Sequence, residues 1–221
     1  MNTRTIEPEA QLDPEQKRLL CDATEWSLIS LLFQCPKHGW KDQISVLSTE
    51  TEDGDLRAAA ESAQTDSSEG LYHSIFGPGG PAPPREVSYR NWAEPGYLIS
   101  ELTSYYDAFS YYPEISEPVD HVAVEAGFIG YLRLKQAYAL ACSDTEHADI
   151  VAEACRQFVE EHLAVFAERL ATRLADSGIT YLARTGTALV RRTGPPADKR
   201  TPIELPILSV EDESAFDCGD A

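Results

Sequence analysis

The side chains best suited to chemistry gather in residues 117–122, which read Glu-Pro-Val-Asp-His-Val. Asp120 stands at or near the N-cap of an expected long helix, where its carboxylate can accept backbone N–H groups. Pro118 makes the approach rigid. His121 follows in the first turn, and Glu125 lies four residues further along the same face. Two carboxylates and an imidazole therefore meet where a loop joins a buried helix, and such an imidazole can change its charge near neutral pH.

Three roles are open for this junction. It can be a capping box with a packed histidine, a catalytic or metal-binding pair made by His121 and Glu125, or a polar anchor in a peptide-binding groove. A carboxylate-bridged di-metal bundle needs two Glu-x-x-His motifs, whereas the sequence offers only Asp144-x-x-His147. Nucleophile-elbow, Walker and dinucleotide-binding motifs are also missing. We therefore predict a protein that is not an enzyme and that holds no metal and no cofactor.

The cysteines do not form a metal or disulfide framework. The chain has five of them: Cys21, Cys35, Cys142, Cys155 and Cys218. Their number is odd, and no Cys-x-x-Cys occurs. Cys35 and His38 form a Cys-x-x-His pair, but no second pair stands at zinc spacing. Free thiols in a reducing compartment are expected.

Apolar residues at three- and four-residue spacing predict helices over most of the chain. The first, at residues 14–33, begins with the helix-start pattern Asp13-Pro14-Glu15. A helix at 120–141 is apolar on nearly all sides, which is typical of the buried centre of a bundle. The remaining predicted helices cover residues 40–47, 56–63, 69–76, 95–109, 145–176 and 180–192.

The predicted fold class is therefore all-α, a single-domain bundle of about seven to eight helices at residues 14–192. An acidic lead-in occupies residues 1–13, and residues 48–55 are expected to be a loop. Residues 193–221 form a tail rich in proline and acidic residues, in which only residues 202–210 have extended character.

Residues 77–84 are expected to form an irregular loop, because four prolines and three glycines in this segment exclude a helix or an interior strand. The segment can be a mere linker between half-domains. Flanking aromatic residues instead indicate that it packs against the protein body: Tyr72, Phe76, Tyr89 and Trp92.

The charge is strongly negative, with 37 acidic against 18 basic residues and a formal net charge of −19. This sign disfavours nucleic acid and anionic lipid as partners and favours a basic one, although a solubility or salt adaptation explains it equally well. We recognise no export signal, since Arg191-Arg192 precedes Pro195-Pro196 rather than an apolar run, and no stretch is long enough to span a membrane. A cytoplasmic protein without membrane insertion is expected.

Two separated segments together resemble the TorD/DmsD/NarJ family of redox-enzyme maturation chaperones. The first is Leu71-Tyr72-His73-Ser74-Ile75-Phe76-Gly77-Pro78, followed by Pro83-Pro84, and the second is Glu117-Pro118-Val119-Asp120-His121-Val122. The resemblance covers roughly residues 15–192. It implies an all-helical fold, no catalytic activity and no cofactor of its own.

The resemblance further implies a client: the apo catalytic subunit of a molybdopterin-dependent oxidoreductase and its twin-arginine signal peptide, whose export waits for cofactor loading. The implied client-binding residues are Tyr72, Phe76, Gly77, Pro78, Glu117, Pro118, Asp120 and His121, and Glu125 adds a possible counter-charge for arginine. The protein is expected to be a monomer or a homodimer. The alternative is a helical adaptor with another basic or amphipathic partner.

One departure from the family pattern concerns the position after the proline pair. Family members often have tryptophan there, whereas Arg85-Glu86 follows Pro84 in this chain. The aromatic role then falls to Tyr89 or Trp92.

Overall fold

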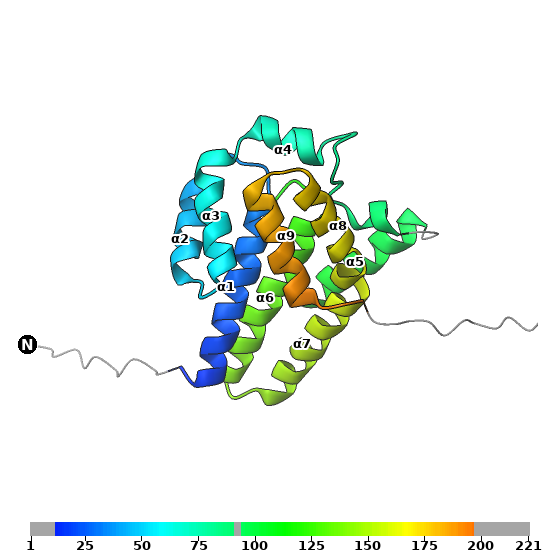
Figure 1. Cartoon of the computed structure of the whole chain (residues 1–221). Helices are drawn as coiled ribbons and strands as arrows, with labels where there is room; N and C mark the ends of the chain where they lie inside the picture. The colour runs from blue at the N-terminus through cyan, green and yellow to red at the C-terminus, as the bar shows by residue number, and fades with distance from the viewer. Residues whose placement is uncertain (1–11, 91–93, 197–221) are drawn as a thin grey trace, which may run out of the picture.

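The computed structural model describes residues 12–90 and 94–196. This part of the chain is helical and contains no β-strand (Figure 1), so the predicted all-α bundle is confirmed. Its elements are α1 (Pro14–Leu32), α2 (Trp40–Glu50), α3 (Gly54–Asp66), α4 (Glu69–Phe76), the 3₁₀ helix η1 (Glu86–Tyr89), α5 (Pro95–Phe109), α6 (Val122–Ala141), α7 (Thr145–Phe158), the π-helical segment η2 (Val159–Leu163), α8 (Ala164–Asp176) and α9 (Thr180–Thr193).

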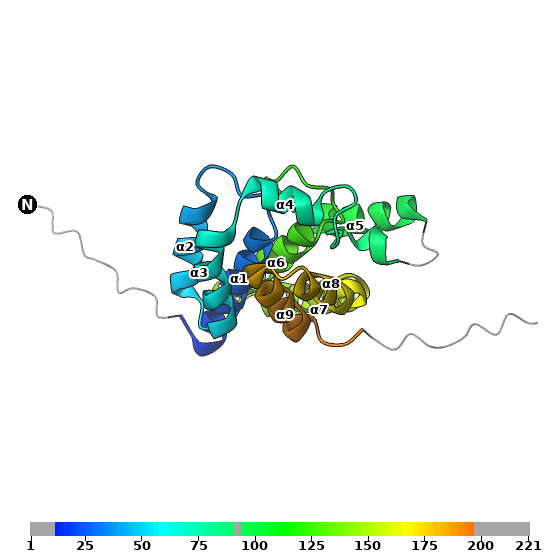
Figure 2. The same cartoon turned by 45° about the horizontal axis from the view of Figure 1, so that its top comes forward.

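Helices α1 and α6 form the centre of the bundle and lie side by side in both views (Figures 1 and 2). Their close approach depends on a glycine, because a Cβ at Gly130 would lie 2.9 Å from Ser27 Oγ and 3.1 Å from the Ala23 carbonyl oxygen. One turn further on, Ser30 Oγ donates to the Ala123 carbonyl at 2.7 Å. The expectation that the helix after residue 120 is buried is therefore correct.

The start of α1 follows the predicted pattern, whereas the boundary between α2 and α3 does not. Asp13 and Gln16 form a reciprocal capping box at the start of α1. The predicted loop at 48–55 is too long, since α2 continues to Glu50 and α3 begins at Gly54. Glu25 of α1 organises the short connection, because its Oε1 accepts from the Thr51 hydroxyl and the Asp53 backbone N–H at 2.8 and 3.2 Å.

Helices α7 and α8 are joined without interruption by η2, so the single helix predicted over residues 145–176 is correct in extent. The π-helical register has no counterpart in the predicted apolar periodicity. Such a bulge is a single widened turn with one extra residue inside an α-helix, so the side chains that follow are rotated. His162 lies within it and is completely buried. Counting this rod once, the described residues form eight helical rods.

Several predictions fall on residues 1–11, 91–93 and 197–221, which lie outside the described residues. They concern most of the lead-in, the role of Trp92, the extended segment at 202–210 and the thiol of Cys218. Within the described residues, no helix has both the length and the apolar character needed to cross a membrane.

Candidate functional site

The loop after α4 is fastened to the beginning of α6. Glu86 N–H donates to the Asp120 carbonyl at 2.8 Å, and Val122 N–H donates to the Pro84 carbonyl at 2.9 Å. These two bonds enclose an isolated antiparallel bridge between Arg85 and His121. The loop is therefore part of the protein body and not a linker between half-domains.

The predicted loop residues divide between buried and exposed positions. Phe76 is buried and packs on Tyr72 and Phe33, with ring centroids 5.1 and 6.3 Å away. Gly77 makes the sharp exit from α4 possible, because a Cβ there would lie 2.3 Å from the His73 carbonyl oxygen. Pro78 is exposed. Gly77 is thus explained by backbone geometry alone.

The aromatic packing expected near this loop includes Tyr89. Its ring stacks on Phe166 at 5.6 Å, and its hydroxyl donates to the Pro83 carbonyl at 2.8 Å. Tyr89 therefore joins the proline pair to α8.

Asp120 does not cap α6. The N-cap is His121, whose Nδ1 accepts the Ala123 backbone N–H at 3.1 Å. The Asp120 carboxylate is completely buried and accepts instead from Arg85 Nε at 2.8 Å and from the Val87 backbone N–H at 3.4 Å. The prediction of an Asp120 cap is wrong because the Asp120 carboxylate binds Arg85 and the backbone of η1 instead. Arg85 is the residue that departs from the family pattern.

A chain of polar contacts joins α4 to the segment before α6. Tyr72 Oη lies 3.3 Å from His121 Nε2 and donates to Glu117 Oε1 at 3.1 Å. Since His121 Nδ1 accepts a hydrogen bond, the neutral ring carries its proton on Nε2 and donates it toward Tyr72. The structure thus brings together Tyr72, Glu117 and His121, three of the residues for which the resemblance implies a role in client binding, while Pro118 is exposed beside them.

His121 is held neutral. Burial lowers its pKa to about 3, and the nearby positive charge of Arg85 acts in the same direction. The expectation that this imidazole changes its charge near neutral pH is therefore wrong. Its role in the folded chain is to accept one hydrogen bond and donate another.

Glu125 points into a buried acid cluster, which we define as Glu86, Arg90, Glu125 and His162. Glu86 accepts from Arg90 Nε at 2.7 Å and contacts His162 Nδ1 at 3.1 Å. Neither oxygen of Glu125 receives a hydrogen bond within the described residues. Burial, together with the charge of Glu86, raises the pKa of Glu125 well above its usual value, so the protonated carboxyl can donate to Glu86.

Glu125 therefore presents no carboxylate at the surface for an arginine. Sequence reasoning missed its partners Glu86, Arg90 and His162. They come from η1, the segment after it, and η2, and no local spacing connects them to residues 117–125.

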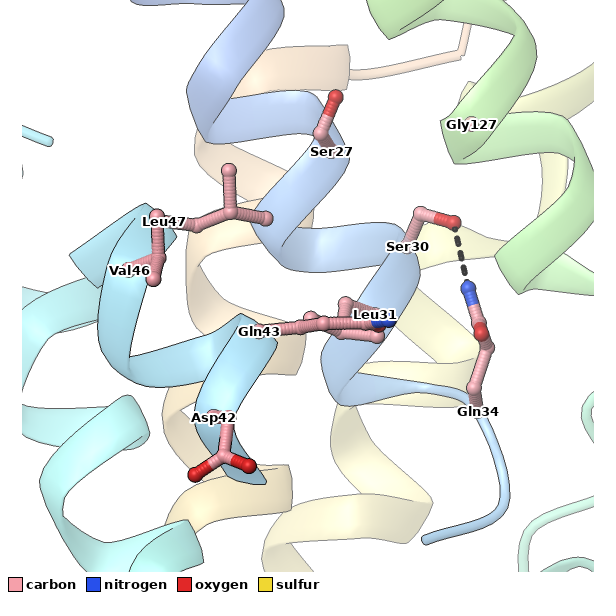
Figure 3. A pocket seen from close by; sticks show the side chains of 9 residues that line it. All are labelled: Ser27, Ser30, Leu31, Gln34, Asp42, Gln43, Val46, Leu47 and Gly127. Atoms are coloured by element: carbon pink, nitrogen blue, oxygen red, sulfur yellow. Dashed lines mark hydrogen bonds between the residues drawn. The ribbon is translucent and has the colours of Figure 1, made fainter. Parts of the chain in front are cut away.

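An open groove lies beside this site, with an acidic half and an apolar half. The acidic half, of about 290 Å³, is lined by Glu114, Glu117, Lys37 and His38 among others. The apolar half, of about 530 Å³, lies between α1, α2 and α6 (Figure 3). The two halves share Gln34 and Gln43. The other residues that line the apolar half are Leu31, Val46, Leu47 and Gly127, together with Ser27, Ser30 and Asp42.

Comparison with protein-family models identifies the class. The model of the nitrate reductase delta subunit family matches residues 46–172, more than half of the 221 residues. The chain belongs to this family, and the resemblance to the TorD/DmsD/NarJ maturation chaperones is confirmed. It is thus a chaperone of the nitrate reductase delta type. A comparison with curated proteins found no match.

Proposed function

We propose that this chaperone acts in the cytoplasm, where it binds the twin-arginine signal peptide of a molybdopterin-dependent oxidoreductase, the apo catalytic subunit, or both. Binding aids cofactor insertion and delays export until maturation is complete. The observation that supports this proposal is the open groove, whose acidic half and apolar half meet at Gln34 and Gln43. A twin-arginine signal has the matching order, a basic segment followed by an apolar one.

Two carboxylates are placed to receive the arginines. Glu114 is exposed, and the Glu117 side chain is one quarter exposed. A guanidinium can bind a carboxylate through two parallel hydrogen bonds. Lys37 lines the same cleft and partly offsets these charges, but the net charge of −19 still attracts a basic peptide over longer distances.

The apolar half of the groove offers a surface for the hydrophobic part of the peptide. Val46 is 64% exposed although it is a large apolar residue, and Leu47 lies beside it on α2. Both residues line the cleft together with Ser27 and Leu31 of α1, and Figure 3 shows the Leu47 side chain directed toward α1. Burial of this surface contributes a part of the binding free energy that salt does not screen.

The test is calorimetric titration of a synthetic twin-arginine signal peptide at low and high salt. Salt is expected to weaken but not abolish binding to the wild type. The double variant Glu114→Gln/Glu117→Gln is expected to lose about tenfold in affinity, the scale of one charge-assisted hydrogen bond, and to lose most of the salt dependence. Val46→Asp is expected to weaken binding at both salt concentrations.

The control is Glu146→Gln, which removes one exposed carboxylate at the start of α7 and is expected to bind as the wild type does. Absence of peptide binding by the wild type, or unchanged binding by both groove variants, would contradict the proposal. Asp120 is a poor probe of peptide contact, because its buried carboxylate holds Arg85 and the loop.

A second candidate function, a helical adaptor for an amphipathic partner, is favoured by a separate apolar surface between α5, α6 and α7. Leu134, Tyr138 and Ile150 are all more than half exposed there, around a cleft of about 920 Å³. The double variant Leu134→Asp/Ile150→Asp distinguishes the two functions. Retained signal-peptide binding by this variant supports the groove and leaves this surface for another partner, whereas loss of binding would place the signal peptide on this surface.

A further inference from the structure

We propose that Cys35, Glu69 and His73 form a binding site for a divalent transition-metal ion, with Zn²⁺ as the preferred ion. The Cys35 sulfur, a Glu69 carboxylate oxygen and a His73 ring nitrogen all lie within 4.8 Å of one another. Cys35 lies in the segment after α1, and Glu69 and His73 lie four residues apart on α4. Within residues 12–90 and 94–196, no other three such ligands converge in this way.

The spacing suits a tetrahedral ion with one open position. Zinc bonds of about 2.0–2.3 Å place neighbouring ligand atoms about 3.3–3.8 Å apart in a tetrahedron. His73 Nε2 and Glu69 Oε1 are already 3.7 Å apart. Both of these side chains are more than half exposed, so small rotations can bring them onto an ion beside the Cys35 sulfur.

The donor set selects the kind of metal. A thiolate and an imidazole favour zinc and similar first-row ions over Mg²⁺ or Ca²⁺, which prefer oxygen ligands. Three protein ligands and an open position leave room for water or a client side chain. The site differs from the Cys35-x-x-His38 pair visible in the sequence, because its other ligands come from a helix more than thirty residues away.

The local charge favours a cation. Cys35 is a buried free thiol, and two negative charges, Glu69 and Glu117, and one positive charge, Lys37, act on it. Binding of M²⁺ to the thiol forms an M–S bond and releases one proton to solvent, so the ion exchanges with that proton and no oxidation occurs. The thiolate and the Glu69 carboxylate then balance the two positive charges.

The ion would join α1 to α4 beside the client groove. Cys35 lines the acidic half of that groove, and the His73 ring contacts Tyr72 at 5.4 Å between centroids. A bound ion would therefore fix α4 next to the Tyr72–Glu117 hydrogen bond. The inference stands on the ligand geometry and does not depend on the proposed client.

The experiment is a titration of the metal-free protein with CoCl₂, followed by competition with ZnCl₂. The wild type is expected to develop a thiolate-to-cobalt charge-transfer absorption that saturates at one equivalent and disappears when Zn²⁺ displaces the cobalt. Cys35→Ala is expected to abolish the band. His73→Gln and Glu69→Gln are each expected to weaken Co²⁺ binding about tenfold or more.

The matched controls are Cys142→Ser and His147→Gln, which alter an exposed thiol after the C-terminal end of α6 and an exposed histidine in the first turn of α7. Both are expected to bind as the wild type does. Circular dichroism checks that each variant is folded. If Cys35→Ala does not fold, the two surface variants decide the matter, since His73 and Glu69 are exposed.

Two results would overturn the proposal. One is a wild type without a saturable thiolate band, and the other is a band that survives both surface substitutions or is lost with Cys142→Ser. No signal peptide takes part in this titration, so its failure leaves the groove proposal standing, and failure of peptide binding leaves the metal site standing.

Discussion

Two groups of charged side chains in this bundle differ in how completely their charges are matched. The first, which we call the α9 clamp, consists of Glu25, Asp53, Asp55, Arg191 and Arg192. Arg192 donates to Glu25 at 2.6 Å and to Asp53 at 2.7 Å, and Arg191 donates to Asp53 and, at 2.8 Å, to Asp55. The clamp fastens the end of α9 to α1 and to the start of α3.

The buried acid cluster lacks this balance. Glu86 has Arg90 and His162 as partners, but neither oxygen of Glu125 receives a hydrogen bond, and His162 Nε2 has no partner within the described residues. The side chains of Glu86, Glu125 and His162 are completely buried. One cationic side chain therefore faces two carboxyl groups.

The comparison shows that cationic partners can keep a carboxyl group ionised against the effect of burial. Arg192 and Arg191 hold the pKa of Asp53 down at about 2 against the opposing effect of burial. Burial and the charge of Glu86 raise the pKa of Glu125 instead. The clamp stabilises the fold through ionised pairs, whereas the acid cluster favours a protonated Glu125.

The largest expected effect comes from breaking the clamp at Arg192. Its side chain is only 12% exposed, and Arg192→Ala leaves Asp53 with Arg191 alone and leaves Glu25, itself mostly buried, without an ion pair among the described residues. We expect the free energy of unfolding to fall by about 3 kcal/mol, measured by urea denaturation at pH 7.

The control for this substitution is Arg156→Ala. Arg156 forms ion pairs with Glu153 and Glu160 on the surface of the α7 rod, and its side chain is 53% exposed. Solvent screens these pairs, so no measurable change in the urea midpoint is expected. Equal losses in both variants would show that the clamp has no special role.

The next effect is a pH dependence that Glu125→Gln removes. In the wild type, the folded-state pKa of Glu125 is above the unfolded value of 4.5, so the folded chain holds a proton that the unfolded chain releases. This contribution to stability is complete below pH 4.5 and is lost as pH rises toward the folded-state pKa. An amide can donate to Glu86 at every pH.

We therefore expect Glu125→Gln to gain stability over the wild type as pH rises above 4.5. Urea denaturation at several pH values measures the difference. Glu146→Gln, at an exposed position, is expected to follow the wild-type curve. Parallel curves for Glu125→Gln and the wild type would mean that Glu125 is ionised in the folded chain.

Helix positions were predictable where punctuation residues fix the ends. The predicted limits of α4 and α5 agree with the structure because Gly77-Pro78 ends one helix and Pro95 begins the other. The α2–α3 boundary was not predictable, because it depends on hydrogen bonds from Glu25, which comes from a helix earlier in the chain. Local pattern contains no information on such contacts.

The candidate site was predictable only in its local parts. The segments around Tyr72 and His121 meet in the structure, whereas the resemblance implies a client-binding role for both segments and not their contact. The partner of Asp120 is Arg85, and that of Glu125 lies in η1, so both depend on how the loop at 77–84 crosses the start of α6. The π-helical register that buries His162 also has no marker in the apolar periodicity.

Both ring nitrogens of the buried His121 have hydrogen-bond partners. Its substitution shows whether such pairing makes the contribution of a buried group to stability insensitive to pH. Its pKa in the folded chain is about 3, below the usual 6.5, so the unfolded chain binds the extra proton. Its contribution to stability is present above pH 6.5 and is lost as pH falls toward 3. The wild type is expected to lose about 2 kcal/mol from this group between pH 6.5 and pH 5.

His121→Asn is the matched variant, because Asn is a good N-cap residue but does not titrate. Its stability is expected to change less over this range, as measured by urea denaturation in buffers of equal ionic strength. An equally steep loss in His121→Asn would assign the acid sensitivity to another group. The contribution of His121 to stability falls as pH decreases, whereas that of Glu125 falls as pH increases. The two variants therefore separate the loss of stability at low pH from the loss at high pH.

The smallest expected effect concerns the hydroxyl that joins α4 to the segment before α6. Tyr72→Phe keeps the ring on Phe76 but removes the contacts to Glu117 and His121. His121 Nε2 and Glu117 Oε2 are 3.9 Å apart, too far for a direct hydrogen bond to replace the missing one. We expect the free energy of unfolding to fall by about 1 kcal/mol.

A double-mutant cycle of Tyr72→Phe and Glu117→Gln isolates the coupling between these two side chains. The control is Tyr131→Phe, which removes another part-buried hydroxyl, one that donates to the Phe109 carbonyl at 3.0 Å. It is expected to cost a similar amount without coupling to Glu117. A coupling indistinguishable from zero would mean that the Tyr72 hydroxyl and the Glu117 side chain do not interact in solution. In that case the backbone before α6, and not a contact with α4, would fix the position of Glu117 in the acidic half of the groove.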